Sequence, residues 1–417
     1  MNISEQNRAL GLSTLAFTIC FAVWTLFSII GVSIKEELLL SDTQFGLLVA
    51  TPVLTGSISR LFLGLWTERY GGRVMFPLQM LLTAMAVWGL TWASSFAGFL
   101  LAALGLGLAG GSFIIGVAYV SRWFGQERQG TALGIFGVGN AGAALTSFAA
   151  PFLVLALGWE GTAQVYAVVL AVSAALFYAL AKTDPVLAQK GGAGKPVATL
   201  ASQLAPLKNP QVWRFSLYYF FVFGGFVALA SFLPRFYMGA YGLELTIAGV
   251  LAGLYAMPGA LFRAFGGWVA DKVGARRVIR FTFALSMLLL LLLGFPGGQF
   301  STQGINGVIT IEFGLSLWGF VVLTVVLGFA MSLGMAAVFK HIPAYYPQHV
   351  GAVGGLVGMI GGLGGFFLPI AFGLLLDLTG IWTTPFLLLF IVVALSSLWM
   401  FLAIRRMEPK SGLSAAT

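Results

Sequence analysis

Long apolar stretches dominate this chain and constrain its fold more than any other feature. A helix that crosses a membrane needs about 20 predominantly apolar residues. The hydropathy pattern of the 417 residues predicts twelve such spans, with the bounds 11–34, 43–67, 74–94, 97–121, 129–156, 161–181, 212–234, 246–270, 277–295, 312–338, 350–376 and 382–404. Only 8% of the residues are charged, against about 25% in soluble domains. The sequence therefore predicts an all-α polytopic membrane protein with the lipid bilayer as its solvent.

The chain has a net charge of +9, and the positions of its basic residues indicate how it is oriented in the membrane. If the N-terminus is cytoplasmic, nearly all basic residues fall in cytoplasmic segments; Lys35 and Arg235 lie on the other side, and Arg60 and Arg263 lie within the membrane. This positive-inside pattern predicts a multi-pass protein of the bacterial cytoplasmic (inner) membrane with both termini cytoplasmic. The basic excess consequently gives no reason to expect a nucleic-acid partner. The first apolar stretch has no cleavage-site pattern after it, which predicts a retained span.

The longest weakly hydrophobic segment, 182–210, is rich in Lys, Gly, Ala and Pro, a composition typical of linkers. We expect an N-terminal six-helix half at 1–182, a cytoplasmic linker at 183–210 and a C-terminal six-helix half at 211–417. The expected working unit is a monomer.

The two predicted halves share sequence motifs. Segment 259–272 matches 56–69 at an offset of 203 residues, with Gly, Arg, Gly and an acid at equivalent places. The glycine pattern of 130–137 recurs in 351–358 at an offset of 221. The larger second offset predicts an insertion between the ninth and tenth helices, around 295–311. Two related six-helix halves with a central site are the organisation of major facilitator transporters.

Arg60 and Arg263 occupy the equivalent intramembrane positions of the repeat. An arginine inside the bilayer costs roughly 2.5 kcal/mol or more, so it usually faces a protein interior. All 13 carboxylates lie at span ends or in loops, so neither arginine has an obvious acidic partner. Two guanidinium groups facing one cavity would bind a small planar oxyanion, whose geometry the guanidinium fork matches. The alternative is that each arginine braces the fold through backbone carbonyls.

The repeat continues into two loops that we interpret as a cytoplasmic gate, latched when the site faces outward. In this interpretation the glycines permit close helix approach, the acids bind a neighbouring span and the basic residues hold the inner surface. The alternative is that the charges set topology alone. The gate residues are Gly64, Glu68, Arg69 and Arg73 in the first half and Gly267, Asp271, Lys272, Arg276 and Arg277 in the second.

The fifth and eleventh predicted spans, 129–156 and 350–376, are unusually rich in glycine, and Asn140 lies among the glycines of the fifth. Small residues at such spacing allow backbones in a membrane to approach closely. A small ligand between these helices would contact backbone groups and the Asn140 amide directly.

The combination of these motifs resembles the nitrate/nitrite porter family (NarK- and NasA-type) of the major facilitator superfamily. The resemblance rests on 137–142, 358–362, Arg60 and Arg263 and covers almost the whole chain. It implies that the two arginines hold nitrate or nitrite, and that Phe113, Tyr219 and Phe223 are its aromatic neighbours. The other implied contacts are Gly139, Asn140, Gly358 and Gly361. Helix 11 has Gly361 where helix 5 has Asn140, so an amide contact from helix 11 is not expected.

The predicted function is transport of nitrate, with or without nitrite, by alternating access, and proton-coupled import is the favoured form. Three alternatives remain open: nitrate/nitrite exchange, transport of another small anion such as formate or oxalate, and an anion sensor. Lys340, His341 and His349 are interpreted as inner-surface or snorkelling charge, and a proton or gating role is the alternative. The single cysteine, the absence of metal-ligand spacing and the absence of a catalytic triad or phosphate loop give no reason to expect a cofactor or an enzyme.

Overall fold

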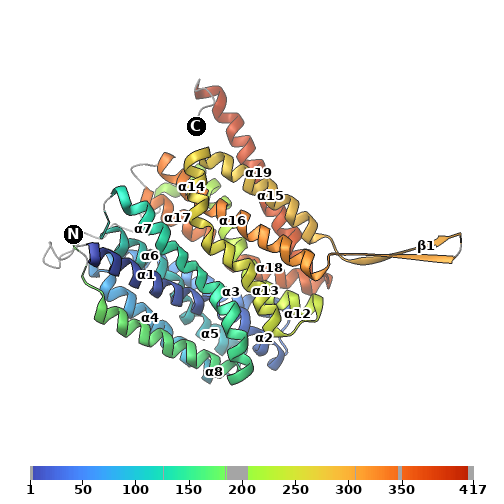
Figure 1. The fold of residues 1–417 in the computed structure, drawn as a ribbon, viewed down its shortest axis with the longest axis horizontal. Helices are drawn as coiled ribbons and strands as arrows, with labels where there is room; N and C mark the ends of the chain where they lie inside the picture. Colours follow the sequence, from blue (N-terminus) through green and yellow to red (C-terminus); the bar gives the residue numbers. More distant parts are fainter. Residues whose placement is uncertain are drawn as a thin grey trace.

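The computed structural model describes residues 3–124, 126–183, 185, 205–305, 307–345 and 350–411, which are almost entirely helical (Figure 1). In these residues ten helical stretches are long and apolar enough to cross a membrane. One of them, Ala132–Leu180, is two helices, because Gly158 has non-helical backbone angles (φ 72°, ψ 175°) inside it. A further helix, Asp42–Tyr70, has 29 residues, which is about 43 Å at 1.5 Å per residue and enough to span the bilayer. The described chain thus supplies twelve membrane-length segments.

The helices follow one another in two series, before and after residues 186–204, which lie outside the described residues. The first series is α1 (Ile3–Trp24), α2 (Phe27–Glu37), α3 (Asp42–Tyr70), α4 (Gly72–Gly89), η1 (Leu90–Trp92), α5 (Phe96–Leu106), η2 (Gly107–Gly111), α6 (Ser112–Ser121), α7 (Gln126–Gly137), η3 (Val138–Ala141) and α8 (Gly142–Leu180). The second series is η4 (Ala205–Lys208), α11 (Pro210–Tyr219), η5 (Phe220–Gly225), α12 (Phe226–Tyr241), α13 (Leu245–Leu261), α14 (Arg263–Val273), α15 (Ala275–Gly294), α16 (Leu317–Tyr345), α17 (Val350–Gly362), α18 (Gly364–Thr379) and α19 (Thr384–Ser411).

Many spans change helix type near their middle. The fourth and fifth spans contain the 3₁₀ segments η2 and η3, and the seventh contains the π-helical segment η5. The eighth span breaks at Phe262 and the eleventh at Leu363. Glycines lie at the breaks of the fourth, fifth, seventh and eleventh spans, where a poor helix former favours an interruption, and Pro258 precedes the break of the eighth. Such 3₁₀ and π segments often mark functional sites. Backbone carbonyls near the breaks can then bond to side chains.

The loops between the second and third spans and between the eighth and ninth spans have the same backbone geometry. Gly71 and Gly274 lie at equivalent places and have positive φ values of 80° and 91°. These angles strain any residue with a Cβ atom, so glycine is required at both positions. The sequence repeat is therefore also a repeat of local structure.

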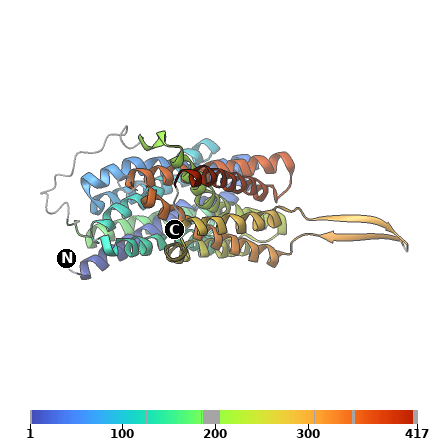
Figure 2. The ribbon, with the colours of Figure 1, turned by 90° about the horizontal axis from the view of Figure 1, so that it is seen from above.

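A β-hairpin separates the ninth and tenth spans and projects from the bundle (Figures 1 and 2). Strands β1 (Gly298–Gly304) and β2 (Gly307–Phe313) pair antiparallel, with Gly298 opposite Phe313. This hairpin is the insertion predicted around 295–311. The expected start of the tenth span at residue 312 is wrong, since β2 runs to Phe313 and α16 begins at Leu317. The apolar residues of β2 were indistinguishable from a helix end by hydropathy.

The two series of helices pack closely at the end of the bundle that carries the hairpin. A Cβ atom on Gly46 of α3 would lie 2.3 Å from the Pro369 carbonyl oxygen of α18, and one on Gly249 of α13 would lie 2.7 Å from the Ser147 carbonyl oxygen of α8. Nearer the opposite end, the glycines with nothing within 4 Å of the Cβ position include four in helix interiors or at a helix end of the spans, Gly134, Gly137, Gly267 and Gly355. At the hairpin end such glycines lie at turns, kinks or helix ends, namely Gly89, Gly158, Gly242, Gly307 and Gly380. The bundle is therefore sealed at the hairpin end and looser at the end that carries the two repeated glycine loops.

Candidate anion-binding site

Arg60 lies where α3 of the first half meets the broken eleventh span of the second. Its Nε donates to the Gly110 carbonyl oxygen of η2 at 3.2 Å, and its Nη1 donates to the Gly358 carbonyl oxygen of α17 at 3.3 Å. The guanidinium carbon is 5.9 Å from the ring centroids of Trp24 and Phe113 and 5.8 Å from that of Phe223. The aromatic faces and backbone oxygens stabilise the charge without a carboxylate.

Arg263 is the first residue of α14, directly after the break in the eighth span. Its Nη2 donates to the Tyr219 hydroxyl at 3.3 Å. The Tyr219 ring stacks on Phe223, with centroids 5.0 Å apart and an interplanar angle of 5°. Since Phe223 also lies beside Arg60, the contacts run from one arginine to the other through these two rings.

The predicted residues Arg60, Phe113, Tyr219, Phe223, Arg263 and Gly358 are thus joined by direct contacts. Both arginines are half-buried, and in the described part of the chain no ion pair joins either of them to a carboxylate. Two like charges held this way favour an anion between them. The structure also supports part of the alternative interpretation, because Arg60 does bond to backbone carbonyls.

The remaining predicted glycines pack against side chains. A Cβ atom on Gly139 would lie 2.3 Å from Phe17, and one on Gly361 would lie 2.4 Å from Tyr219. Gly361 is therefore part of the wall behind Tyr219, whereas Gly139 lets α1 approach η3. Neither glycine has direct contact with an arginine among the contacts described.

Asn140 lies in η3 and is 6% exposed. Its segment packs against α1 and α13. No hydrogen bond to its side chain occurs within the described residues, so the amide retains its capacity to bind a ligand. Its position at the break of the fifth span is the counterpart of the break near Gly362 in the eleventh.

The structure gives the predicted gate residues contacts within their own halves. Arg69 lies over the Tyr70 ring at 5.3 Å, Arg73 over Tyr178 at 5.3 Å, and Lys272 over Trp268 at 4.1 Å. A Cβ atom on Gly64 would lie 3.2 Å from Ile114, as expected for close helix approach. Gly267 faces open space, so the same expectation is wrong for that glycine in this conformation.

The side chains of the acidic gate residues Glu68 and Asp271, and His349, lie outside the described part of the chain. His341 is described, and its ring stacks on Phe215 with centroids 5.7 Å apart. Arg277 donates to the Val273 carbonyl oxygen of its own half at 3.4 Å. Arg276 and Lys340 also make polar or electrostatic contacts in the structure.

Sequence reasoning did not assign Trp24, Ser57 or Gly362 to the site around Arg60, although Gly362 lies in the segment 358–362 that carries the family resemblance. Trp24 is 2% exposed, donates from its indole nitrogen to the Pro52 carbonyl oxygen, and lies over the guanidinium. Ser57, one turn before Arg60, is fully buried and its hydroxyl has no hydrogen-bond partner among the described residues. A Cβ atom on Gly362 would lie 2.8 Å from the Ser57 oxygen and 3.4 Å from Arg60 Nη1. The three-residue spacing of Ser57 and Arg60 was the available signal, because it puts both on one helix face.

Comparison with known proteins agrees with this architecture. Residues 12–319 and 304–417 match the Major Facilitator Superfamily. The "Probable nitrate/nitrite antiporter NarK1" of Thermus thermophilus is 41% identical over 97% of this chain and 93% of its own length. The "Nitrite extrusion protein" of Bacillus subtilis is 33% identical over 96% of this chain and 95% of its own length.

Among solved structures, the chain is similar to a bacterial homologue of the human lysosomal transporter Spinster, described as inward-facing and occupied. The TM-score is 0.74 at 17% sequence identity, with 97% of this chain and 98% of that chain covered. This likeness shows the fold.

The helical bundle and the family match define a major facilitator transporter, a multi-pass membrane protein and not an enzyme. Within that superfamily, the chain belongs to the nitrate/nitrite porter family. The fold and family predicted from the sequence are thereby confirmed.

Proposed function

We propose that this protein is a secondary active transporter of nitrate, and of nitrite at the same site, in the bacterial inner membrane. The observation that carries the proposal is the pair of arginines from opposite halves, connected through the stacked rings of Tyr219 and Phe223. A flat oxyanion between the two guanidinium groups would neutralise their repulsion and accept hydrogen bonds from both. The names of the relatives in Thermus and Bacillus support nitrate and nitrite as the anions.

The proposed orientation places both termini in the cytoplasm, as the positive-inside pattern predicts. The hairpin end then faces the periplasm, and the looser end with the repeated glycine loops faces the cytoplasm. In this orientation the structure is an inward-facing conformation. We retain a division into halves at 1–182 and 211–417 and a monomeric working unit as parts of the proposal.

Two forms of coupling are compatible with the site. Import of an anion against an inside-negative potential costs about 2.3 kcal/mol per charge per 100 mV. Proton-coupled import therefore needs at least two protons for each nitrate. Exchange of nitrate for nitrite cancels the charge and needs no proton carrier. The Thermus relative is named an antiporter, and the described site contains arginines and aromatic rings without a contacting carboxylate, so exchange is the second candidate.

Transport into proteoliposomes tests the substrate and the coupling together. Nitrate uptake is measured with and without internal nitrite and with and without an imposed pH gradient. Stimulation by internal nitrite alone indicates exchange, and stimulation by an inward proton gradient alone indicates symport. Formate and oxalate serve as competing anions. If either of these moves while nitrate does not, the proposed substrate is wrong.

A further inference from the structure

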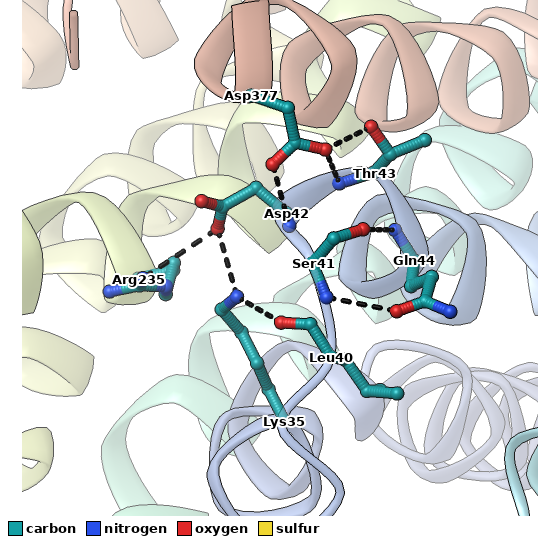
Figure 3. Close-up of polar contacts among 8 residues, drawn as sticks. All are labelled: Lys35, Leu40, Ser41, Asp42, Thr43, Gln44, Arg235 and Asp377. Carbon is teal, nitrogen blue, oxygen red and sulfur yellow. Dashed lines mark hydrogen bonds and ion pairs between the residues drawn. The ribbon is translucent and has the colours of Figure 1, made fainter. Parts of the chain in front are cut away.

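A polar cluster connects the first series of helices to the second where the start of α3 meets α12 and α18 (Figure 3). The first half contributes Lys35 and the start of α3, and the second half contributes Arg235 of α12 and Asp377 of α18. None of these residues belongs to the predicted anion site or to the predicted gate motif. They lie at the periplasmic end in the orientation proposed above.

Asp377 closes the N-terminus of α3 from the opposite half. Its carboxylate accepts the backbone N–H groups of Asp42 at 3.0 Å and Thr43 at 2.8 Å, and also the Thr43 hydroxyl. The first N–H groups of a helix lack partners within the helix, and they carry the positive end of its dipole. A carboxylate in this position forms charge-assisted hydrogen bonds. Ser41 and Gln44 complete the same end as a capping box within the first half.

The Asp42 side chain makes a second connection beside the first. Its carboxylate lies 3.3 Å from Lys35 Nζ and 3.6 Å from Arg235 Nη2. Lys35 is in the same half as Asp42, whereas Arg235 is in the other half. The Arg235 guanidinium also lies over the Trp382 ring, 4.8 Å from its centroid. Two contacts between the halves thus hold the start of α3. The Asp377 carboxylate accepts its backbone N–H groups, and the Asp42 carboxylate pairs with the Arg235 guanidinium.

The space beneath this cluster is nearly closed. A small cavity there has room for about one water molecule, 10 Å³, and Asp42, Ser231 and Arg235 are among its lining residues. A second, smaller space continues from Ser231 and Val49 toward Trp24, which contacts Arg60. The polar cluster consequently lies beside two small spaces that follow one another from Asp42 toward Trp24.

We propose that Asp42, Asp377 and Arg235 form an outer gate, which must separate before the anion site can open to the periplasm. Asp42 and Asp377 of the gate lie on the same two spans, the second and the eleventh, as Arg60 and Gly358 of the anion site. Asp42 and Arg60 are 18 residues apart on α3, about 27 Å along the helix. At the site, Arg60 donates to Gly358 of the eleventh span. An anion that accepts the hydrogen bond from Arg60 Nη1 in place of the Gly358 carbonyl breaks this contact between the second and eleventh spans. Anion binding therefore favours opening of the gate.

Thiol labelling of a Ser231→Cys variant tests gate opening without reference to the transported anion. Ser231 is 5% exposed and lies directly under the gate. The one native cysteine, Cys20, is fully buried, so labelling of the parent protein measures the background rate. An impermeant thiol reagent is applied from the periplasmic side. Asp377→Asn is expected to increase the labelling rate about tenfold, the shift that corresponds to roughly 1.4 kcal/mol.

Glu244→Gln is the matched control, because it removes a carboxylate from an exposed position at the same end of the bundle. Equal labelling rates in Asp377→Asn and Glu244→Gln would overturn the proposal. Since labelling does not depend on nitrate, this result is separate from a failure of the proposed substrate.

A cross-link provides an independent test, because a covalent bond in the oxidised protein holds together the two positions that Asp377 joins in the parent. Thr43→Cys with Asp377→Cys joins the two halves on oxidation, and we expect transport to fall at least tenfold and to recover after reduction. Ser41→Cys with Gln44→Cys is the control, since both residues lie in one half. A Thr43/Asp377 pair that does not cross-link, or that transports equally well oxidised and reduced, contradicts an outer gate at this place.

Discussion

Replacing Arg60 by lysine keeps the positive charge and removes the planar fork, so it isolates what the geometry contributes. The guanidinium has contacts with two backbone oxygens, at 3.2 and 3.3 Å, from two different spans. A lysine ammonium has its three donors on one nitrogen and cannot present the two parallel N–H groups of a planar fork. A hydrogen bond to a charged group contributes about 1.5–3 kcal/mol. The loss of one such bond to the anion predicts binding that is about 10- to 150-fold weaker.

The measurement is nitrate binding to purified protein, followed by the concentration dependence of uptake into proteoliposomes. Arg280→Lys is the matched control, since Arg280 is an exposed arginine of α15 outside the site. Arg60→Lys should raise the half-saturating nitrate concentration, and Arg280→Lys should leave it unchanged. Nitrate affinity within twofold of the parent in Arg60→Lys would refute bidentate recognition by this arginine.

Three further substitutions test other parts of the structure. Tyr219→Phe keeps the stacked ring and removes the hydroxyl that accepts a hydrogen bond from Arg263. This variant should bind nitrate more weakly, by about tenfold at most. Unchanged nitrate affinity would argue against a role of the hydroxyl in orienting Arg263. Ser57→Ala removes a buried, unpaired hydroxyl and should weaken nitrate binding while leaving thermal stability the same or higher; lower stability would mean a structural role instead. In Gly142→Ala the new Cβ would lie 2.1 Å from the Thr18 carbonyl oxygen, so this variant should unfold at lower temperature, whereas Gly134→Ala, with nothing within 4 Å, should not.

The repeated segment around Arg60 illustrates how far sequence patterns carry. The intramembrane arginines, the matching glycines and the missing acidic partners predicted a paired anion site, and the structure joins both arginines through Tyr219 and Phe223. The pattern did not predict that one copy is a continuous helix and the other is broken at Phe262. Break positions depend on packing between spans, which a motif alignment does not contain.

The hairpin and the polar cluster show the limits of hydropathy. Strand β2 has the apolar composition of a helix end, so only the pairing with β1 distinguishes it. Asp42 and Asp377 appeared in the sequence simply as carboxylates at span ends. These two residues bond to each other although they are 335 residues apart in the chain, and no local spacing relates them.

The sequence alone determined that this chain crosses a membrane repeatedly, in two related halves, with two costly arginines that require an interior site. These properties follow from transfer free energies of individual residues and from repetition, which are readable without coordinates. Only the tertiary structure decided which carbonyls, rings and hydroxyls surround Arg60, and which end of the bundle is sealed. Those features depend on distances between spans, because backbone breaks and close glycine contacts fix how the two halves meet.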